Sequence, residues 1–193
     1  MSEKCQRGVG CPGYSQTMTS PSTTIPPVTT SDPIAHIART DSPIGRIEVT
    51  SDGESITSLS IARGGVLPGD GRPESRVPVL DRAIEQLAEY FAGERTDFDL
   101  PVAVVGTEFQ RSVWAELSRL PFGAVASYGY IGAATGRATA GRAVGGAVGA
   151  NPVPIIVPCH RILGTDGRIT GYSGGEGIPT KAWLLDHEGI PHR

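Results

Sequence analysis

The stretch that organises the chain is Pro154-Ile155-Ile156-Val157-Pro158-Cys159-His160-Arg161. The β-branched run between its prolines predicts a short buried strand, because proline removes the next donor of a β-ladder. A thiol and an imidazole follow at the end of this predicted strand. Adjacent strand side chains point to opposite faces, so Cys159 and His160 can cooperate only through a bend or a bridging water. Either arrangement lets His160 take the thiol proton and leave a nucleophilic thiolate.

A Cys-His pair taken alone is more often structural than reactive, because buried thiols commonly act as small hydrophobic groups. The surrounding sequence reverses this. Residues 151–161 closely resemble the active-site segment of the O6-alkylguanine-DNA alkyltransferases, and the similarity runs from about residue 107 to residue 189. Four more segments occur in the order of that family, namely Ser127-Tyr128, Gly141-Arg142-Ala143-Val144-Gly145, Gly171-Tyr172-Ser173-Gly174-Gly175 and Trp183-Leu184-Leu185-Asp186-His187-Glu188-Gly189.

The composition places the chain among globular proteins. Its 193 residues, of which 38% are hydrophobic, permit one domain or two small ones. No apolar run approaches the roughly 18 residues that a membrane-spanning helix needs, and the N-terminus lacks a signal-peptide apolar segment. Three cysteines do not make a disulfide framework and suit a reducing compartment. We therefore expect a soluble cytoplasmic monomer that does not bind membranes and needs no metal or cofactor.

The net charge of −3 is unevenly distributed. Residues 1–118 carry 10 basic and 16 acidic side chains, a net charge of −6. Residues 119–193 carry 7 basic and 4 acidic side chains, a net charge of +3. The C-terminal part is therefore the part expected to face the phosphates of DNA.

Residues 1–32 are rich in Ser, Thr, Pro and Gly and are predicted to form a disordered tail. Cys5 and Cys11 lie in it with a spacing unlike that of common zinc pairs, and only His36 is near enough to be a third ligand. We therefore assign no metal site to the tail.

Residues 33–100 are predicted to form a small α/β domain. Leu80, Leu87 and Phe91 belong to an apolar pattern with helical spacing, and Gly93 is placed to end this helix. The resemblance implies a ribonuclease-H-like sheet and helix, a supporting domain without chemistry of its own. Three short antiparallel strands are expected at residues 34–38, 45–50 and 56–61.

Residues 106–193 are predicted to form a mostly helical, winged-helix-like domain. Thr107 and Gln110 can form a capping box, so a helix should begin at Glu108 and end at residues 121–123. Trp114 belongs to its apolar stripe and is expected in the core. A helix-turn-helix is expected from two short helices at residues 130–135 and 140–149, the second capped by Thr139.

The second of these short helices contains four glycines, each of which costs up to about 1 kcal/mol relative to alanine. Gly141, Gly145 and Gly149 leave one face bare, so that either a protein element or a nucleic acid can approach closely. Arg142 beside this face favours DNA. The resemblance implies that the helix enters the minor groove of double-stranded DNA, and that Arg142 fills the space left by an extruded alkylated base.

The resemblance also implies roles for single residues. Tyr128 is expected to donate a proton or hydrogen bond to the leaving guanine, and Glu188 to fix the tautomer of His160 in a Glu-His-water-Cys relay. Asn151 is expected to brace the active-site loop. Residues 176–179 make the segment before the last helix a couple of residues longer than is usual in the family. Substrate contacts are expected from Tyr172, Ser173, Val157 and Ile162.

The sequence thus predicts a DNA repair protein that moves an alkyl group irreversibly from O6-alkylguanine to Cys159, once per molecule. O4-alkylthymine is a second candidate lesion. One alternative is a non-enzymatic helix-turn-helix DNA-binding protein with a structural or redox-sensing cysteine. Another is a Cys-His hydrolase that works through an acyl-enzyme.

Overall fold

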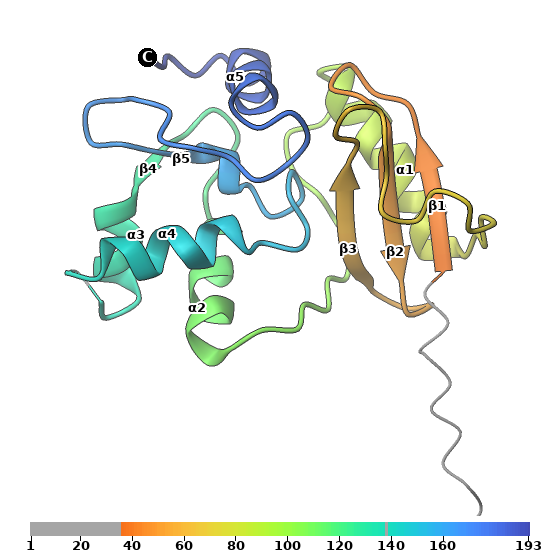
Figure 1. Cartoon of the computed structure of the whole chain (residues 1–193), viewed down its shortest axis with the longest axis horizontal. Coiled ribbons are helices and arrows are strands. Elements are labelled where there is room, and N and C mark those ends of the chain that lie inside the picture. The colour runs from red at the N-terminus through yellow and green to blue at the C-terminus, as the bar shows by residue number, and fades with distance from the viewer. Residues whose placement is uncertain (1–35, 138) are drawn as a thin grey trace, which may run out of the picture. The chain divides into compact units, whose positions relative to one another are not determined.

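The computed structural model describes residues 36–137 and 139–193. The predicted tail, with Cys5 and Cys11, lies outside the described residues. The described elements follow one another as β1 (His36–Thr40), β2 (Ile47–Ser51), β3 (Ile56–Ile61), α1 (Pro78–Phe91), α2 (Glu108–Leu117), β4 (Ala126–Ser127), α3 (Tyr128–Ala134), α4 (Gly141–Gly149), the 3-10 helix η1 (Cys159–Arg161), β5 (Ile162–Leu163) and α5 (Ile178–His187) (Figure 1).

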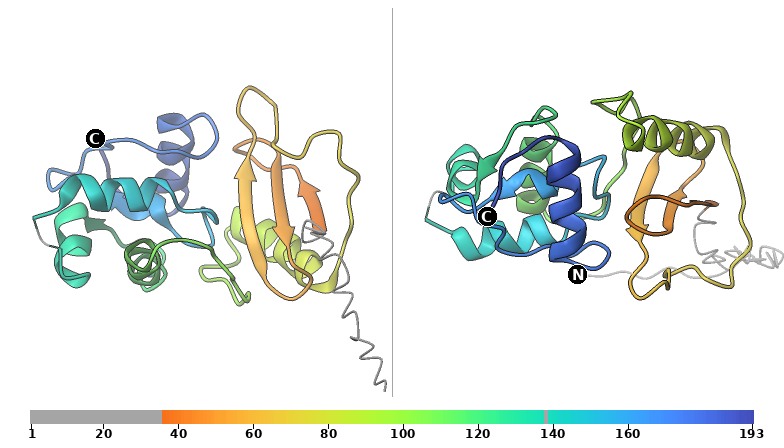
Figure 2. Two further views of the ribbon diagram at one scale, coloured as in Figure 1. Left: turned by 60° about the horizontal axis from the view of Figure 1, so that its bottom comes forward. Right: turned by 90° about the horizontal axis from the view of Figure 1, so that it is seen from above.

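The first three strands form an antiparallel sheet in the order β1-β2-β3, which confirms the predicted strands. The second strand begins two residues later than expected, and the first is described from His36 onward. Leu80, Ala83 and Leu87 of the apolar pattern of α1 are fully buried, whereas Phe91 is half-buried. This helix covers one face of the sheet (Figure 2). Gly93 follows the helix with a φ of 78°, which glycine adopts without a steric penalty.

The edge strand β3 is bonded to two later segments of the chain. The linker pairs with the start of β3, where Ile56 N donates to Pro101 O at 2.8 Å and Ala103 N donates to Ile56 O at 2.9 Å. Farther along β3, Leu59 N donates to Pro152 O at 2.8 Å. The sheet is therefore joined to the segment that leads into the predicted reactive centre.

The capping box predicted for α2 is present. Thr107 Oγ1 accepts from Gln110 N at 3.2 Å, and the Gln110 side chain accepts from Thr107 N at 2.9 Å. The helix ends at Leu117 and not at residues 121–123, because Arg119 N and Leu120 N bond the carbonyls three residues back, at Glu116 and Leu117, in tighter turns.

Helices α3 and α4 form the predicted helix pair, but Thr139 does not cap α4. The N-cap residue is Ala140, and no side chain caps the helix. An added Cβ on Gly141, Gly146 or Gly149 would meet nothing within 4 Å, so close protein packing does not explain these glycines. The opposite face of α4 is buried, and the Trp114 indole Nε1 donates to Ala147 O at 2.9 Å.

The strand predicted over residues 155–157 is wrong. The segment turns, with a bridge between Pro154 and Val157 and a φ of 73° at Ile155. The Asn151 side chain takes the place of a neighbouring strand, because Nδ2 donates to Val157 O at 2.7 Å and Oδ1 accepts from Val153 N at 3.1 Å. After this turn the reactive pair lies in η1, and β5 then pairs in parallel with β4.

The α/β fold class, with a small sheet-and-helix part followed by a mostly helical part, is confirmed. No helix within the described residues is long and apolar enough to cross a membrane.

The Trp114 hydrogen bond should be a measurable part of the stability of the fold. Trp114→Phe keeps an aromatic ring but leaves the Ala147 carbonyl without its indole donor. We expect a loss of about 1–3 kcal/mol in the free energy of unfolding, measured by urea denaturation. Trp183→Phe is the matched control. It removes a similar side-chain volume at another position, where the indole stacks on His187. Equal losses in both variants would mean that ring volume, and not the hydrogen bond, sets the cost.

Candidate active site

Cys159 opens η1 and is almost fully buried, with 3% of its surface exposed. Burial raises the pKa of its thiol, and hydrogen bonding from Asn151 together with the positive charge of Lys181 partly offsets this rise. The thiol therefore rests protonated near neutral pH. A base must take its proton before it can act as a nucleophile.

His160 supplies a base in the required protonation state. Its Nε2 lies 2.8 Å from Glu188 Oε1. A carboxylate can only accept, so Nε2 carries the proton and Nδ1 keeps a free lone pair. Nδ1 is buried and has no hydrogen-bond partner in the described structure. Burial also lowers the pKa of His160, which keeps the ring neutral.

Glu188 is the most heavily bonded side chain of the site. Oε1 accepts from Tyr90 Oη at 2.8 Å, from His160 Nε2 and from Arg161 Nη2 at 2.9 Å. Oε2 accepts from Arg161 Nε at 2.8 Å and from Gly123 N at 3.3 Å. Burial opposes ionisation, but the bonds from His160 and Arg161 outweigh it and lower the pKa of the carboxyl group. Glu188 is therefore a buried carboxylate at neutral pH.

A cavity of about 590 Å³ leads to Cys159. Its wall is formed by Tyr128, Gly141, Arg142, Gly145, Val148, Gly149, Cys159, Thr170, Gly171, Tyr172 and Ser173. Val157 and Ile162 do not line it, so their predicted substrate contacts find no support in this cavity. Both side chains are buried elsewhere in the core. The other predicted contact residues, Tyr172 and Ser173, line the same cavity as the thiol, together with the glycine face of α4.

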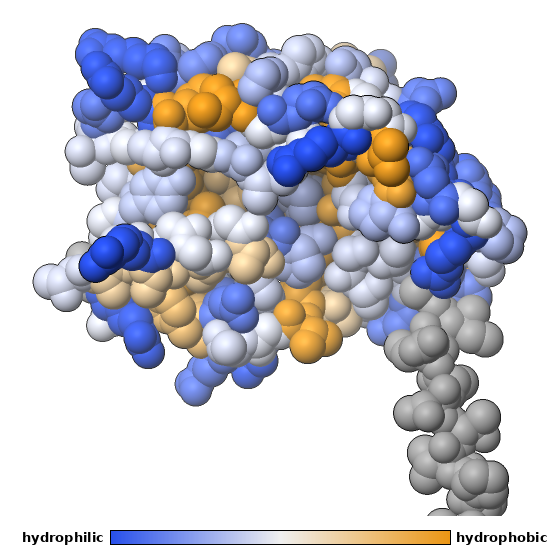
Figure 3. All heavy atoms as spheres, in the orientation of Figure 1, coloured by the Kyte–Doolittle hydropathy of each residue, from blue (hydrophilic) through white to orange (hydrophobic). Residues whose placement is uncertain are grey.

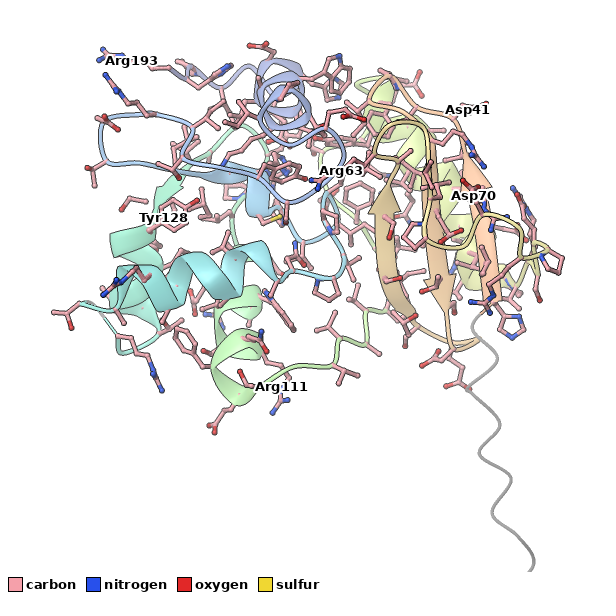
Figure 4. The ribbon with its side chains drawn as sticks, in the orientation of Figure 1. Asp41, Arg63, Asp70, Arg111, Tyr128 and Arg193 are labelled. Atoms are coloured by element: carbon pink, nitrogen blue, oxygen red, sulfur yellow. The ribbon has the colours of Figure 1, made fainter. Side chains whose placement is uncertain are left out.

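Tyr128 and Tyr172 present their hydroxyl groups differently. Tyr128 Oη accepts from Thr170 Oγ1 at 3.0 Å, which leaves its own proton available to a ligand (Figure 4). The Tyr172 hydroxyl is buried beside Cys159 and has no partner of ordinary geometry in the described part of the chain. The cavity therefore offers donors on two sides.

The mouth of the cavity opens on the face that carries α4. Figure 3 shows this face, where the surface over α4 is of intermediate hydropathy and is bordered by hydrophilic groups. Arg142 is exposed there. A bare helix face beside a guanidinium group suits the close approach of a polyanion.

Two family descriptions match the chain. One, for the ribonuclease-like domain of 6-O-methylguanine DNA methyltransferase, covers residues 36–104, and the other, for the DNA binding domain, covers residues 108–190. The chain belongs to this family.

Individual relatives agree with this assignment. The methylated-DNA–protein-cysteine methyltransferase of Mycobacterium tuberculosis is 41% identical over 79% of this chain and 92% of its own length. That of Bacillus subtilis is 39% identical over 79% of this chain and 94% of its own. The crystal structure of the M. tuberculosis protein, O6-methylguanine methyltransferase, superposes with a TM-score of 0.72 over 80% of this chain and 93% of that one. The same protein in complex with DNA gives 0.71 at 40% identity, over 79% and 92% of the two chains.

Sequence reasoning did not identify three side chains that belong to the site. Arg161 directly follows Cys159 and His160. A guanidinium group can donate two parallel hydrogen bonds to a carboxylate, and this property could have indicated a bond to Glu188. Lys181 lies inside α5, where burial lowers its pKa to about 8 and its Nζ donates to Ile162 O at 2.5 Å. Tyr90 lies in α1, far away in sequence, and no local pattern could have connected it with Glu188.

The lowered pKa of Glu188 predicts a pH-dependent contribution to stability. Such a group stabilises the fold above its unfolded pKa, near 4.5, and this contribution is lost as the pH falls below that value. Glu188→Gln removes it and leaves Arg161 without its counter-ion, so we expect a loss of about 3–5 kcal/mol at pH 7.

Urea denaturation from pH 7 to pH 3 checks this prediction. The difference between the parent protein and Glu188→Gln should narrow below about pH 4.5. Glu85→Gln, at an exposed carboxylate, should follow the parent protein throughout. A difference that stays constant with pH would contradict the assigned ionisation.

Proposed function

We propose that this chain is a methylated-DNA–protein-cysteine methyltransferase (EC 2.1.1.63) that repairs O6-alkylguanine in double-stranded DNA. The observation that carries the proposal is a buried thiol at the end of a cavity that opens beside the bare face of α4, followed in the sequence by a neutral imidazole whose Nδ1 has no hydrogen-bond partner among the described residues. The protein acts as a monomer in the cytoplasm, where a reducing compartment keeps the thiol available. O4-alkylthymine is a second substrate of the same site.

The reaction begins with transfer of the thiol proton to His160 Nδ1, directly or through one water molecule. The imidazolium that forms is stabilised by the Glu188 carboxylate on its other nitrogen. The thiolate sulfur then forms a bond to the alkyl carbon as the bond from that carbon to O6 breaks. The electron pair of the broken bond passes to the guanine, and a hydrogen bond or proton from Tyr128 stabilises the leaving base.

The substrate must leave the duplex to reach this thiol. The O6 group lies within the base stack, whereas Cys159 lies at the inner end of a cavity. The nucleotide therefore rotates into the cavity, where it meets Tyr172 and Ser173. Arg142 is exposed on α4 beside the cavity mouth and occupies the vacated position in the stack.

The product of the reaction identifies the function. Incubation with duplex DNA containing O6-methylguanine should add the mass of one methylene group to the Cys159 peptide, as measured by mass spectrometry of a digest. Cys5 and Cys11 should stay unmodified. A thioether is stable and the site holds no group to remove it, so one lesion should be repaired per protein molecule.

Two outcomes would contradict the proposed function. Repaired DNA beside an unmodified Cys159 would exclude the assigned nucleophile. Sustained turnover would favour the hydrolase alternative, since a hydrolase regenerates its thiol.

Arg142→Ala tests the role of the exposed guanidinium group. A side chain that fills the stack compensates for unpairing and unstacking, which costs a few kcal/mol, so transfer from duplex DNA should slow by about 10- to 100-fold. Free O6-benzylguanine needs no extrusion and should react almost as fast as with the parent protein. Both rates are measured in single-turnover assays. Arg168→Ala is the charge control, because this exposed arginine forms an ion pair with Asp166 and with no other described residue.

Equal losses of rate on free base and on duplex would show that Arg142 supports the pocket or the fold. A loss of duplex affinity as large as the loss of rate would indicate a simple phosphate contact.

A further inference from the structure

One wall of the active-site cavity is held by the N-terminal part of the chain. The loop of residues 171–177 carries Tyr172 and Ser173, which line the cavity, and it lies against the end of β3. Arg63 follows β3 and extends toward this loop (Figure 4).

Three hydrogen bonds join these two segments. Arg63 Nε donates to Gly175 O at 2.9 Å, and Arg63 Nη2 donates to Ser173 O at 3.2 Å. In the other direction, Glu176 Oε1 accepts from Gly64 N at 2.6 Å. The donors and acceptors are 110 to 112 residues apart in sequence. We call this set, made by Arg63, Gly64, Ser173, Gly175 and Glu176, the loop clasp.

Packing beneath the loop clasp shows that the fit is close. A Cβ added to Gly175 would meet Ile61 Cγ2 at 2.9 Å, and one added to Gly174 would meet Ile61 Cδ1 at 3.3 Å. Gly175 also has a φ of 50°, which favours glycine. The loop therefore rests directly on the last residue of β3.

The segment of residues 176–179, which the resemblance implies to be a couple of residues longer than usual, supplies one acceptor of the loop clasp. Glu176 lies in this longer segment, and its carboxylate reaches back to Gly64 N. Its own main-chain N donates to Thr180 Oγ1 at 3.0 Å, so Glu176 is held from both sides.

We infer that Arg63 and Glu176 determine substrate selectivity by fixing the distance between the loop wall and Cys159. The Tyr172 hydroxyl lies beside the thiol, in the region that the O6 substituent must enter. A wall held this close favours a methyl group over larger substituents. Arg63 and Glu176 are positioning residues, since neither lines the cavity.

The loop has room to move once it is released. A separate cavity of about 640 Å³ borders the same segment and is lined in part by Arg63, Ser173 and Gly175. Lys181 holds only the start of the loop, where its Nζ lies 3.4 Å from Gly171 O. Loss of the clasp would therefore let residues 173–176 shift outward and widen the entrance beside the thiol.

Arg63→Ala and Glu176→Ala test the inference in two independent ways. The first is amide hydrogen exchange of the peptide that contains residues 171–177, which should become at least several-fold faster in both variants. This readout needs no alkyl transfer. Unchanged exchange in both variants would show that the clasp does not restrain the loop.

The second readout is selectivity, which rests on the proposed alkyl transfer. Single-turnover rates are measured on matched duplexes with O6-methylguanine or O6-benzylguanine. Loosening the wall should slow methyl transfer by about tenfold through poorer alignment. The larger benzyl group gains space in the widened cavity, so benzyl transfer should slow less than methyl transfer. The ratio of the benzyl-transfer rate to the methyl-transfer rate should therefore rise about threefold or more.

Matched variants separate this effect from charge and folding. Glu176→Gln keeps the acceptor for Gly64 N and should keep the parent ratio. Arg63→Lys cannot span both carbonyls and should give an intermediate ratio. Arg76→Ala should change neither readout, because this exposed arginine pairs, within the described part of the chain, with Glu74 and Asp81 alone. If Arg63→Ala slowed methyl transfer and benzyl transfer equally, so that the ratio of the two rates stayed unchanged, Arg63 would have no role in selectivity.

The reaction of the parent protein with the two duplexes tests the proposed function independently of the variants. A parent protein that fails to react with either duplex contradicts the proposed function, and the exchange measurement alone then decides whether the loop clasp exists.

Discussion

The Glu188 carboxylate, which follows α5, accepts hydrogen bonds from three other segments that are far apart in sequence. Donors reach it from α1, from the turn after α2 and from two residues of η1. A buried carboxylate is costly unless its lone pairs are filled, so each donor must be in place when the fold is complete. The same bonds orient His160 so that Nδ1 stays free. Folding and the protonation state of the reactive pair therefore depend on one group.

This arrangement explains how a buried thiol can be reactive. Burial keeps Cys159 protonated and therefore protected, while His160, the next residue of the chain, is held neutral by burial and keeps a free lone pair on Nδ1. Lys181 adds a positive charge near the sulfur, and with a pKa of about 8 it is mostly charged at neutral pH. The thiolate would thus form in a site whose charges already favour it, without solvent reorganisation.

Local patterns predicted the elements that local forces determine. The capping box at Thr107, the strands of the sheet and the helix pair follow from spacing and side-chain type alone. The strand predicted before Cys159 is absent because the Asn151 side chain donates a hydrogen bond to the Val157 carbonyl and so stabilises a turn. The apolar run alone does not indicate this bond. Thr139 failed as a cap because the chain enters α4 one residue later, through Ala140. In the first case a side chain six residues away decided the conformation.

The contribution of the N-terminal part could not be read from the sequence for the same reason. Sequence reasoning assigned it support alone, yet it reaches the site at three places: Leu59 bonds the segment before the reactive centre, Tyr90 bonds Glu188, and Arg63 bonds the substrate loop. Each contact spans about 90 residues or more of chain, a separation at which spacing carries no information. None of the three touches the cavity, but together they fix the thiol-bearing turn, the base and the opposite wall. A domain without a reactive group of its own can therefore set both the geometry and the selectivity of a site that lies in another part of the chain.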